Sequence, residues 1–446
     1  MKSKVLLIYL PGIETGYGPI FPMGIGYLLS AIKQDREAIA VNYELMDRAF
    51  LQLPDVINSF RPDIIGLSCT TFNRGNISRF CEWSKKYFPH IKIIIGGVHA
   101  SFFPEQMLFD YDADYVVIGE GEQTLRELCD AIDIGDGIKL RRVKGIAYKI
   151  SSGDYNYIIT EPRDMVKNLD DLIPPNFGYA ENMMKKSRLG FVITSRGCPA
   201  HCNFCCTSTY WGQKVRMYSV KRVVDEIEIM INKYGANKIL FHDDTFNLSI
   251  KRVIEICDEI INRKLNITWA AACRVHPVSK EMIEKMIEAG CRHICWGVES
   301  GSEKMLKLID KKITKEQIKN AYDLCKEYIG IISVGAFTMV GNPGESEETI
   351  NESSEFINTL SLTDNPGTAA LYILPGTKVY KDLKTKNPDI DNFWIENEGM
   401  LRPPEFSLQQ LTSWATKISR SGSYCPFDRN KHFFNNILFG NIPIGE

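Results

Sequence analysis

The sequence predicts an α/β protein with two successive units and a small C-terminal region. In the first 130 residues, short β-branched runs alternate with amphipathic stretches, a pattern typical of buried parallel strands separated by helices. A polar or glycine-rich turn follows each of these runs. The alternation resumes at Gly190 and fades near residue 400. We therefore expect a doubly wound parallel sheet, and then a second set of about five or six strand–helix units.

The strands of the first unit are predicted at residues 5–9, 64–68, 91–95 and 115–118. The turns after these strands share the carboxyl edge of the sheet, where ligands bind in doubly wound folds. Glycine in such turns lets a ligand approach the backbone closely. The candidate ligand-site residues in these turns are Ser68, Thr70, Gly96, Gly97, His99, Glu120 and Gly121.

A proline- and glycine-containing stretch follows the first unit. It includes Pro174 and Pro175, a basic patch at 139–144 and a predicted hairpin around 151–154. Polar turns at this density indicate a linker. We find no residues with evident chemistry in it.

The strands of the second unit are predicted at residues 191–194, 238–241, 268–272, 293–297 and 334–340. The stretch 219–234 carries apolar residues at helical spacing, and Thr314 with Gln317 indicates a capping box. Polar residues follow the strands, among them Asp243, Asp244 and Arg274. The parallel strands would bring these residues to one edge.

Composition limits the class of protein. The chain has 446 residues, is 24% charged and has a net charge of -2, so no basic surplus indicates nucleic acid. No apolar run reaches the roughly 18 residues that span a bilayer, and the start is interpreted as a strand and not as a signal peptide. The 13 cysteines form no secreted disulfide pattern, and several, such as Cys257 and Cys325, lie in apolar runs. We expect a cytoplasmic protein.

The segment CPAHCNFC places Cys198, Cys202 and Cys205 at a spacing that offers three thiolates and no fourth. Structural zinc sites and electron-carrying iron–sulfur clusters usually take four protein ligands, so a triplet leaves one metal corner open. An open iron can bind a substrate. The alternatives are three ordinary cysteines, or a noncatalytic module in which they hold zinc.

This Cys-x3-Cys-x2-Cys motif, with Phe204 before the last cysteine, resembles the cluster motif of the radical S-adenosylmethionine (SAM) enzymes. The resemblance implies a 4Fe-4S cluster whose fourth iron chelates SAM, and reductive cleavage of SAM to a 5′-deoxyadenosyl radical. Cys206 would break the spacing and is expected to pack beside the cluster. Cys273, Cys291 and Cys295 are interpreted as apolar strand residues.

Most of residues 1–133 resemble the cobalamin-binding domain that precedes many radical SAM domains, through PMGIGYLLSAI, PDIIGLSCTT, GGVHAS and GEGE. The resemblance implies that the seven turn residues named above bind cobalamin. The motif Asp-x-His-x-x-Gly, whose histidine ligates cobalt, is absent here. His99 would therefore lie near the nucleotide tail or corrin edge and would not ligate cobalt. Alternatively, the double glycine is a plain turn and GEGE a helix start.

The strings DDTF, GVESGS and GNPGES resemble blocks of the same family, which implies a partial (β/α)6 barrel with its reactive groups at the carboxyl ends of the strands. Arg274 would then bind the SAM carboxylate, and Glu299 its ribose or amino group. Asp244 is the expected ligand contact, whereas Asp243 is equally well explained as a turn or cap residue. His242 faces substrate or is a loop histidine.

The resulting domain prediction is a cobalamin-binding-like domain at 1–135, a linker at 136–187, a radical SAM barrel at 188–400 and a C-terminal capping region at 401–446 with a helix at 406–418. Cys425 in this region stands alone, which argues against a second cluster.

The predicted function is a cobalamin-dependent radical SAM methyltransferase acting on an unactivated carbon. A radical cyclase, oxidase or rearrangement enzyme on the same scaffold is the alternative. The expected substrate is a small molecule, a lipid or a peptide, and the expected electron donor is a flavodoxin or ferredoxin.

Overall fold

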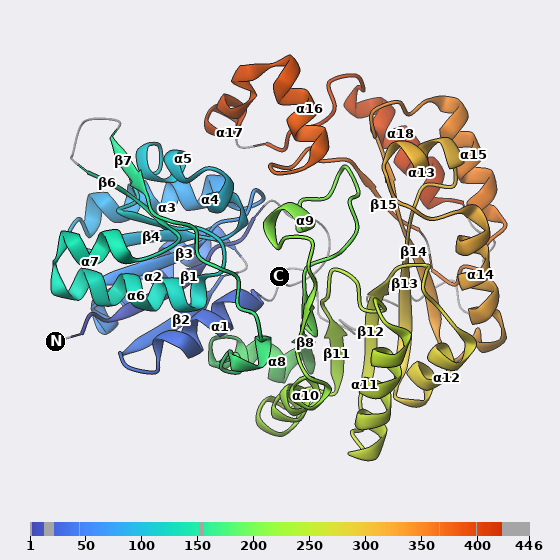
Figure 1. The fold of residues 1–446 in the computed structure, drawn as a ribbon, viewed down its shortest axis with the longest axis horizontal. Coiled ribbons are helices and arrows are strands. Elements are labelled where there is room, and N and C mark those ends of the chain that lie inside the picture. Colours follow the sequence, from blue (N-terminus) through green and yellow to red (C-terminus); the bar gives the residue numbers. More distant parts are fainter. Residues whose placement is uncertain are drawn as a thin grey trace. The chain divides into compact units, whose positions relative to one another are not determined.

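The computed structural model describes residues 2–12, 22–43, 45–150, 156–364, 366–397 and 399–421 (Figure 1). The chain divides into two compact units. The first contains Met1–Asn182 and Leu383–Met400, and the second contains Met183–Asp382 and Leu401–Glu446. The sequence did not predict that the chain returns to its first unit after residue 382.

The first unit is built on a seven-stranded sheet with the order β2-β1-β3-β4-β5-β6-β7. The first five strands in this order pair in parallel, and β6 and β7 extend the sheet antiparallel. The strands are β1 Val5–Tyr9, β2 Ala38–Asn42, β3 Ile64–Ser68, β4 Lys92–Gly96, β5 Tyr115–Val117, β6 Ile146–Lys149 and β7 Tyr157–Ile159. The doubly wound parallel sheet predicted from the sequence is confirmed.

Strand β2 was not predicted, although residues 38–41 form an apolar run; it lies at the edge of the sheet and is half-buried. Strands β6 and β7 lie in the segment interpreted as a linker and pair antiparallel on either side of the hairpin predicted around 151–154. The turn of this hairpin lies outside the described residues.

Helices cover both faces of this sheet (Figure 1). Successive residues of β1 enter opposite cores, with Leu6 and Ile8 in one cluster and Val5 and Leu7 in the other. The helices are α1 Met23–Ile32, α2 Met46–Phe60, α3 Arg74–Tyr87, α4 Val98–Phe102, α5 Pro104–Phe109, α6 Gly121–Ile134 and α7 Gly137–Arg142, with short 3-10 turns η1 Leu169–Asp171 and η2 Gly178–Ala180.

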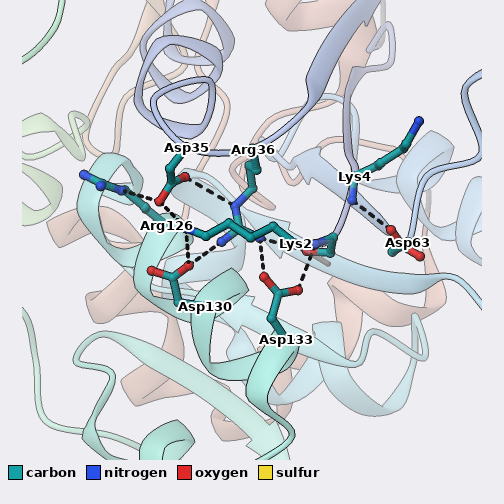
Figure 2. Close-up of polar contacts among 9 residues, drawn as sticks. Lys2, Lys4, Asp35, Arg36, Asp63, Arg126, Asp130 and Asp133 are labelled. Carbon is teal, nitrogen blue, oxygen red and sulfur yellow. Dashed lines mark hydrogen bonds and ion pairs between the residues drawn. The ribbon is translucent and has the colours of Figure 1, made fainter.

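An ion-pair network closes the amino edge of the sheet (Figure 2). The buried guanidinium of Arg36, just before β2, pairs with Asp130 and Asp133 on α6. Lys2, just before β1, pairs with Asp35 at 2.6 Å and with Asp130 at 3.3 Å. Charge-assisted bonds to a planar guanidinium are directional, so this network fixes two strand starts to one helix. The carboxyl edge lies at the other end of the strands.

The second unit contains a six-stranded parallel sheet with the order β15-β14-β13-β12-β11-β8. The strands are β8 Leu189–Val192, β11 Lys238–Phe241, β12 Thr268–Cys273, β13 Cys291–Glu299, β14 Ser333–Val340 and β15 Gly367–Ala370. A small antiparallel pair, β9 Ser195–Arg196 and β10 Arg216–Met217, follows β8. The predicted partial (β/α)6 barrel is confirmed, although β15 was not predicted.

The helices of the chain from residue 181 onward connect these strands or follow them. Ser219 caps one helix, and Thr314 with Gln317 forms the predicted capping box on another. They are α8 Glu181–Ser187, α9 Thr207–Tyr210, α10 Val220–Tyr234, α11 Ile250–Asn262, α12 Lys280–Glu288, α13 Glu303–Leu308, α14 Lys315–Cys325, α15 Glu347–Asn358, α16 Lys378–Lys386, α17 Phe393–Glu396 and α18 Leu408–Ser419, with η3 Lys326–Tyr328 and η4 Pro388–Asn392. The helix predicted at 406–418 corresponds to α18.

Candidate functional site

The cysteine loop lies between β9 and α9, beyond the carboxyl end of β8. Cys202 is buried, Cys198 and Cys205 are half-buried, and all three are free thiols. The Cys205 N–H donates to the Cys202 carbonyl at 3.1 Å, which turns the loop. Asn203 anchors the loop because its backbone N–H donates to the Ile309 carbonyl at 3.1 Å. The loop is therefore held by its backbone, and the thiols are available to a metal group.

Hydrogen-bond donors and positive charges surround these thiols. The Thr207 N–H donates to Cys205 Sγ at 3.5 Å, and Cys198 Sγ lies 3.6 Å from Thr245 Oγ1. Burial raises the pKa of the Cys202 thiol, and the positive charges of Lys311 and Arg274 partly offset this rise. Thiolates are the metal-binding form, so nearby cations and N–H donors suit a bound metal group.

Three cysteine thiols in one loop are the donor type that iron–sulfur clusters use, in which each thiolate binds its own iron. In the part of the chain that the structure describes, no group of three or more His, Cys, Asp or Glu side chains is placed to hold a single metal ion. Cys206 precedes α9 and burial raises its pKa to about 11. Cys273, Cys291 and Cys295 are buried strand residues.

The two aspartates after β11 have different environments. Asp243 is buried and accepts hydrogen bonds from the Thr194 N–H at 3.0 Å and from the Ser195 hydroxyl at 2.7 Å. Burial raises the pKa of Asp243 to about 6. Asp244 is exposed, and its Oδ1 accepts from the Thr207 hydroxyl at 3.1 Å. Asp243 therefore ties β11 to the segment after β8, whereas Asp244 faces the cysteine loop.

Asn247 fixes the backbone around Arg274. The buried amide of Asn247 accepts from the Arg274 N–H at 2.8 Å and donates to the carbonyls of Arg274 and Pro277, both at 2.7 Å. The Arg274 guanidinium in turn donates to the Lys311 carbonyl at 2.7 Å. The Asn247 bonds thus hold the Arg274 backbone, and the Lys311 carbonyl holds the guanidinium, whose charge acts on Cys202.

Glu299, at the end of β13, is paired with Lys311. Their side chains are 14% and 7% exposed, and Glu299 Oε1 lies 2.7 Å from Lys311 Nζ. Glu299 has a φ of 64°, which is rare outside glycine and directs its side chain away from the regular strand geometry. A Cβ on Gly297 would lie 3.1 Å from Lys311 Nζ and 3.2 Å from Glu299 Oε1, so glycine makes room for this pair.

A buried carboxyl group organises the turn after β14. Glu345 accepts from the N–H groups of Gly341 and Asn342, and burial raises its pKa to about 7. Asn342 Oδ1 is buried and has no hydrogen-bond partner among the described residues. This turn carries the GNPGES string.

The turns at the carboxyl edge of the first sheet lock together through backbone contacts. Gly97 has a φ of 101°, and a Cβ there would lie 2.5 Å from the Cys69 carbonyl oxygen. Asn73 donates to the carbonyls of Leu10 at 3.1 Å and Ser68 at 3.0 Å, and its Oδ1 accepts from the Thr70 N–H at 2.7 Å. Asn73 therefore joins the ends of β1 and β3, the switch point where doubly wound sheets bind ligands.

The other predicted residues of this edge differ in exposure. Gly96, Gly97 and Gly121 are half-buried. Glu120 precedes α6, and its Oε2 accepts from the Val166 N–H at 2.8 Å, so it also holds the following segment. His99 is completely buried, with its ring nitrogens 3.1 Å from the Thr71 hydroxyl and 3.2 Å from Gln106 Oε1.

Sequence reasoning missed Asn73, Asn247, Lys311 and Glu345. Local signals existed for Asn73, since asparagine is common just before a helix, and for Glu345, which lies in the GNPGES string. Asn247 and Lys311 reach their partners 27 and 12 residues away, so nothing in the local sequence indicated them.

The fold defines a class: an α/β enzyme with a doubly wound sheet, an open parallel barrel and a loop with three free cysteine thiols beyond the barrel's first strand. The family model described as B12 binding domain matches residues 10–129, and that of the Radical SAM superfamily matches residues 192–357. The chain belongs to the cobalamin-binding radical SAM enzymes. The cofactors of this enzyme are a 4Fe-4S cluster, SAM and cobalamin.

Several relatives support this assignment. The chain is 32% identical over 424 residues to an uncharacterized methyltransferase, PH0819, of Pyrococcus horikoshii, which covers 93% of this chain and 90% of the relative. It is 30% identical over 366 residues to an anaerobic magnesium-protoporphyrin IX monomethyl ester cyclase of Rubrivivax gelatinosus, covering 78% of this chain and 64% of the relative. The fold is similar to that of the methyltransferase TsrM of Kitasatospora setae, with a TM-score of 0.74, 20% identity, and coverage of 86% and 76% of the two chains.

None of the described helices is long and apolar enough to cross a membrane.

Proposed function

We propose that this enzyme is a cobalamin-dependent methyltransferase that modifies an unactivated carbon. The observation that carries the proposal is the 32% identity to PH0819, named a methyltransferase, across both units of the chain. Polar methyl transfer cannot reach a carbon that lacks nucleophilicity, so methylation of such a carbon needs a radical as well as a methyl donor. This need explains why one chain combines the two units. When bound, the three cofactors supply a hydrogen-abstracting radical and a transferable methyl group.

The residues of the second unit are assigned as follows. Cys198, Cys202 and Cys205 hold the cluster. Arg274 binds a carboxylate of SAM, because a fixed guanidinium suits that group. Glu299 and Asp244 accept hydrogen bonds from the SAM ribose or amino group. The Glu299–Lys311 pair supports this role, since Lys311 holds the carboxylate in one position.

The turn residues of the first unit are assigned to cobalamin. Ser68, Thr70, Gly96, Gly97 and Gly121 line the carboxyl edge, where a ligand meets backbone and small side chains. The proposed roles of Glu120 and His99 are indirect. Glu120 holds Val166, and both ring nitrogens of His99 face protein groups.

The proposed substrate is a small molecule, a lipid or a peptide side chain, and the proposed electron donor is a flavodoxin or ferredoxin. A reducing cytoplasm suits both the free thiols and the cluster. We propose no nucleic-acid partner, since the net charge is -2.

The test uses anaerobically reconstituted enzyme, SAM with a deuterated methyl group, and candidate substrates from the three classes. Methyl transfer predicts cobalamin-dependent S-adenosylhomocysteine and a product that has gained the labelled methyl group. Formation of 5′-deoxyadenosine without either of these would refute methyl transfer.

The alternative is a radical cyclase or oxidase, and the 30% identity to the Rubrivivax cyclase favours it as the second candidate. It predicts 5′-deoxyadenosine together with a product that has lost hydrogen and carries no label. A colourless protein that holds zinc and leaves SAM intact would contradict both candidates.

A further inference from the structure

We propose that residues 383–397 and 399–400, here called the return segment, support the cobalamin site, with Arg74 and Trp394 as its positioning residues. The return segment belongs to the first unit although it follows the barrel strands in sequence. The inference rests on the family assignment, which places cobalamin in this unit.

Arg74 attaches the return segment to the first unit. Its side chain is buried, with only 1% of the residue exposed. One terminal nitrogen donates to the Thr71 carbonyl at 2.7 Å, and the other donates to the carbonyls of Asn397, at 2.6 Å, and Gly399. A planar guanidinium with donors on two arms can bridge these chain segments, whereas a lysine amine offers one point charge.

Trp394 packs against both Arg74 and His99. Its ring lies 4.8 Å from the Arg74 guanidinium carbon, a cation–π contact, and meets the His99 ring edge-on at 5.8 Å. Trp394 itself is buried. The return segment therefore closes a small polar core beneath the turns after β3 and β4.

His99 is the centre of this polar core. Its Nδ1 lies 3.1 Å from the Thr71 hydroxyl, and its Nε2 lies 3.2 Å from Gln106 Oε1. Burial and the Arg74 charge lower the His99 pKa to about 3, so the ring is neutral. With Nε2 donating to the amide oxygen, Nδ1 accepts from Thr71. Both nitrogens are occupied, and the ring fixes Thr71 instead of reaching a ligand.

The polar core connects directly to the ligand edge. Arg74 follows Asn73, which joins the ends of β1 and β3. The backbone N–H of His99 donates to the Cys69 carbonyl at 3.2 Å, and this bond joins the turn after β4 to the turn after β3. Removing Trp394 would open His99 and Arg74 to water and loosen both turns where the cofactor binds. Trp394 thus acts on the ligand edge through Arg74 and His99.

The test titrates aquacobalamin into anaerobically reconstituted full-length enzyme and follows the corrin spectrum. Trp394→Ala should weaken binding about tenfold, equivalent to about 1.4 kcal/mol, whereas Trp394→Phe, which keeps a ring over Arg74, should stay within about threefold of wild type. Arg74→Lys should resemble Trp394→Ala. The matched control is Lys384→Ala, because Lys384 pairs with Asp391 in the exposed part of the same segment.

Two results would overturn the proposal. One is cobalamin affinity in Trp394→Ala equal to that of wild type, with only the melting temperature lowered, which is the outcome of a purely structural role. The other result would come from hydrogen exchange of the wild-type enzyme, without any variant. Cobalamin should slow backbone hydrogen exchange of wild-type enzyme at 393–397 and at 97–103, and exchange unchanged in both segments would refute the link.

Discussion

Lys311 Nζ lies 2.7 Å from Glu299 Oε1, and the two side chains are nearly withdrawn from water. The pair joins the end of β13 to the segment after α13, and the backbone carbonyl of Lys311 also holds Arg274. One residue that the sequence did not indicate therefore contacts both groups assigned to SAM.

Replacing Lys311 by methionine should destabilise the protein strongly. The change leaves the Glu299 carboxylate enclosed without its partner, a situation that typically costs about 3 kcal/mol or more. Urea unfolding measures the loss. The control is Lys319→Met, whose pair with Asp323 is 59% and 52% exposed and should contribute less than about 1 kcal/mol. Equal losses in the two variants would contradict a special role for the Glu299 pair.

Asn247→Ala should lower SAM affinity while the cluster is retained. The substitution leaves the Arg274 N–H and two carbonyls without their partner, at a cost of about 1–3 kcal/mol for each buried group that water cannot reach. Arg274 should then lose its fixed position. Calorimetric SAM titration and iron content separate the two effects. Asn247→Asp is the matched variant, since it keeps the acceptor for Arg274. SAM affinity unaffected in Asn247→Ala would refute the positioning role.

Gly97→Ala should be more harmful than Gly119→Ala. Both glycines have positive φ, at 101° and 79°, and Gly97 has a ψ of -179°, a backbone region essentially confined to glycine. At Gly97 the new Cβ also meets backbone, 2.5 Å from the Cys69 oxygen, whereas nothing lies within 4 Å at Gly119. Denaturant unfolding of the two variants compares their losses of stability. Indistinguishable unfolding midpoints for the two variants would show that the turn at Gly97 is not in close contact with the backbone at Cys69.

Glu345 should make folding stability fall with rising pH. Burial raises its folded pKa from 4.5 to about 7, so between these values the unfolded chain has released a proton that the folded chain retains. The contribution of Glu345 to the free energy of unfolding is complete below pH 4.5 and is lost as the pH rises through 7. Glu345→Gln keeps an acceptor for Gly341 and Asn342 and should remove this contribution. Unfolding measured at several pH values tests the sign, and an unchanged slope in the variant would contradict it.

The sequence predicted the central strands of the first sheet well because they are continuous apolar runs. It missed the edge strand β15, which has no large apolar side chain, and the edge strand β2, although residues 38–41 form an apolar run. Cys198, Cys202 and Cys205 were recognisable because their spacing is local. Asn247 and Lys311 were not, since they reach Arg274 and Glu299 only in the folded chain. The burial of His99 against Trp394 could not be predicted, because Trp394 lies 295 positions later in the chain and leaves no trace in the local pattern.

The discontinuity of the first unit has a consequence for biosynthesis. Multidomain chains generally fold from the N-terminus while still on the ribosome. Here the guanidinium of Arg74 bonds a carbonyl 323 residues later in the chain, so this contact forms only after the barrel strands have been synthesised. Translation thereby delays the completion of the first unit until its distant segment has left the ribosome.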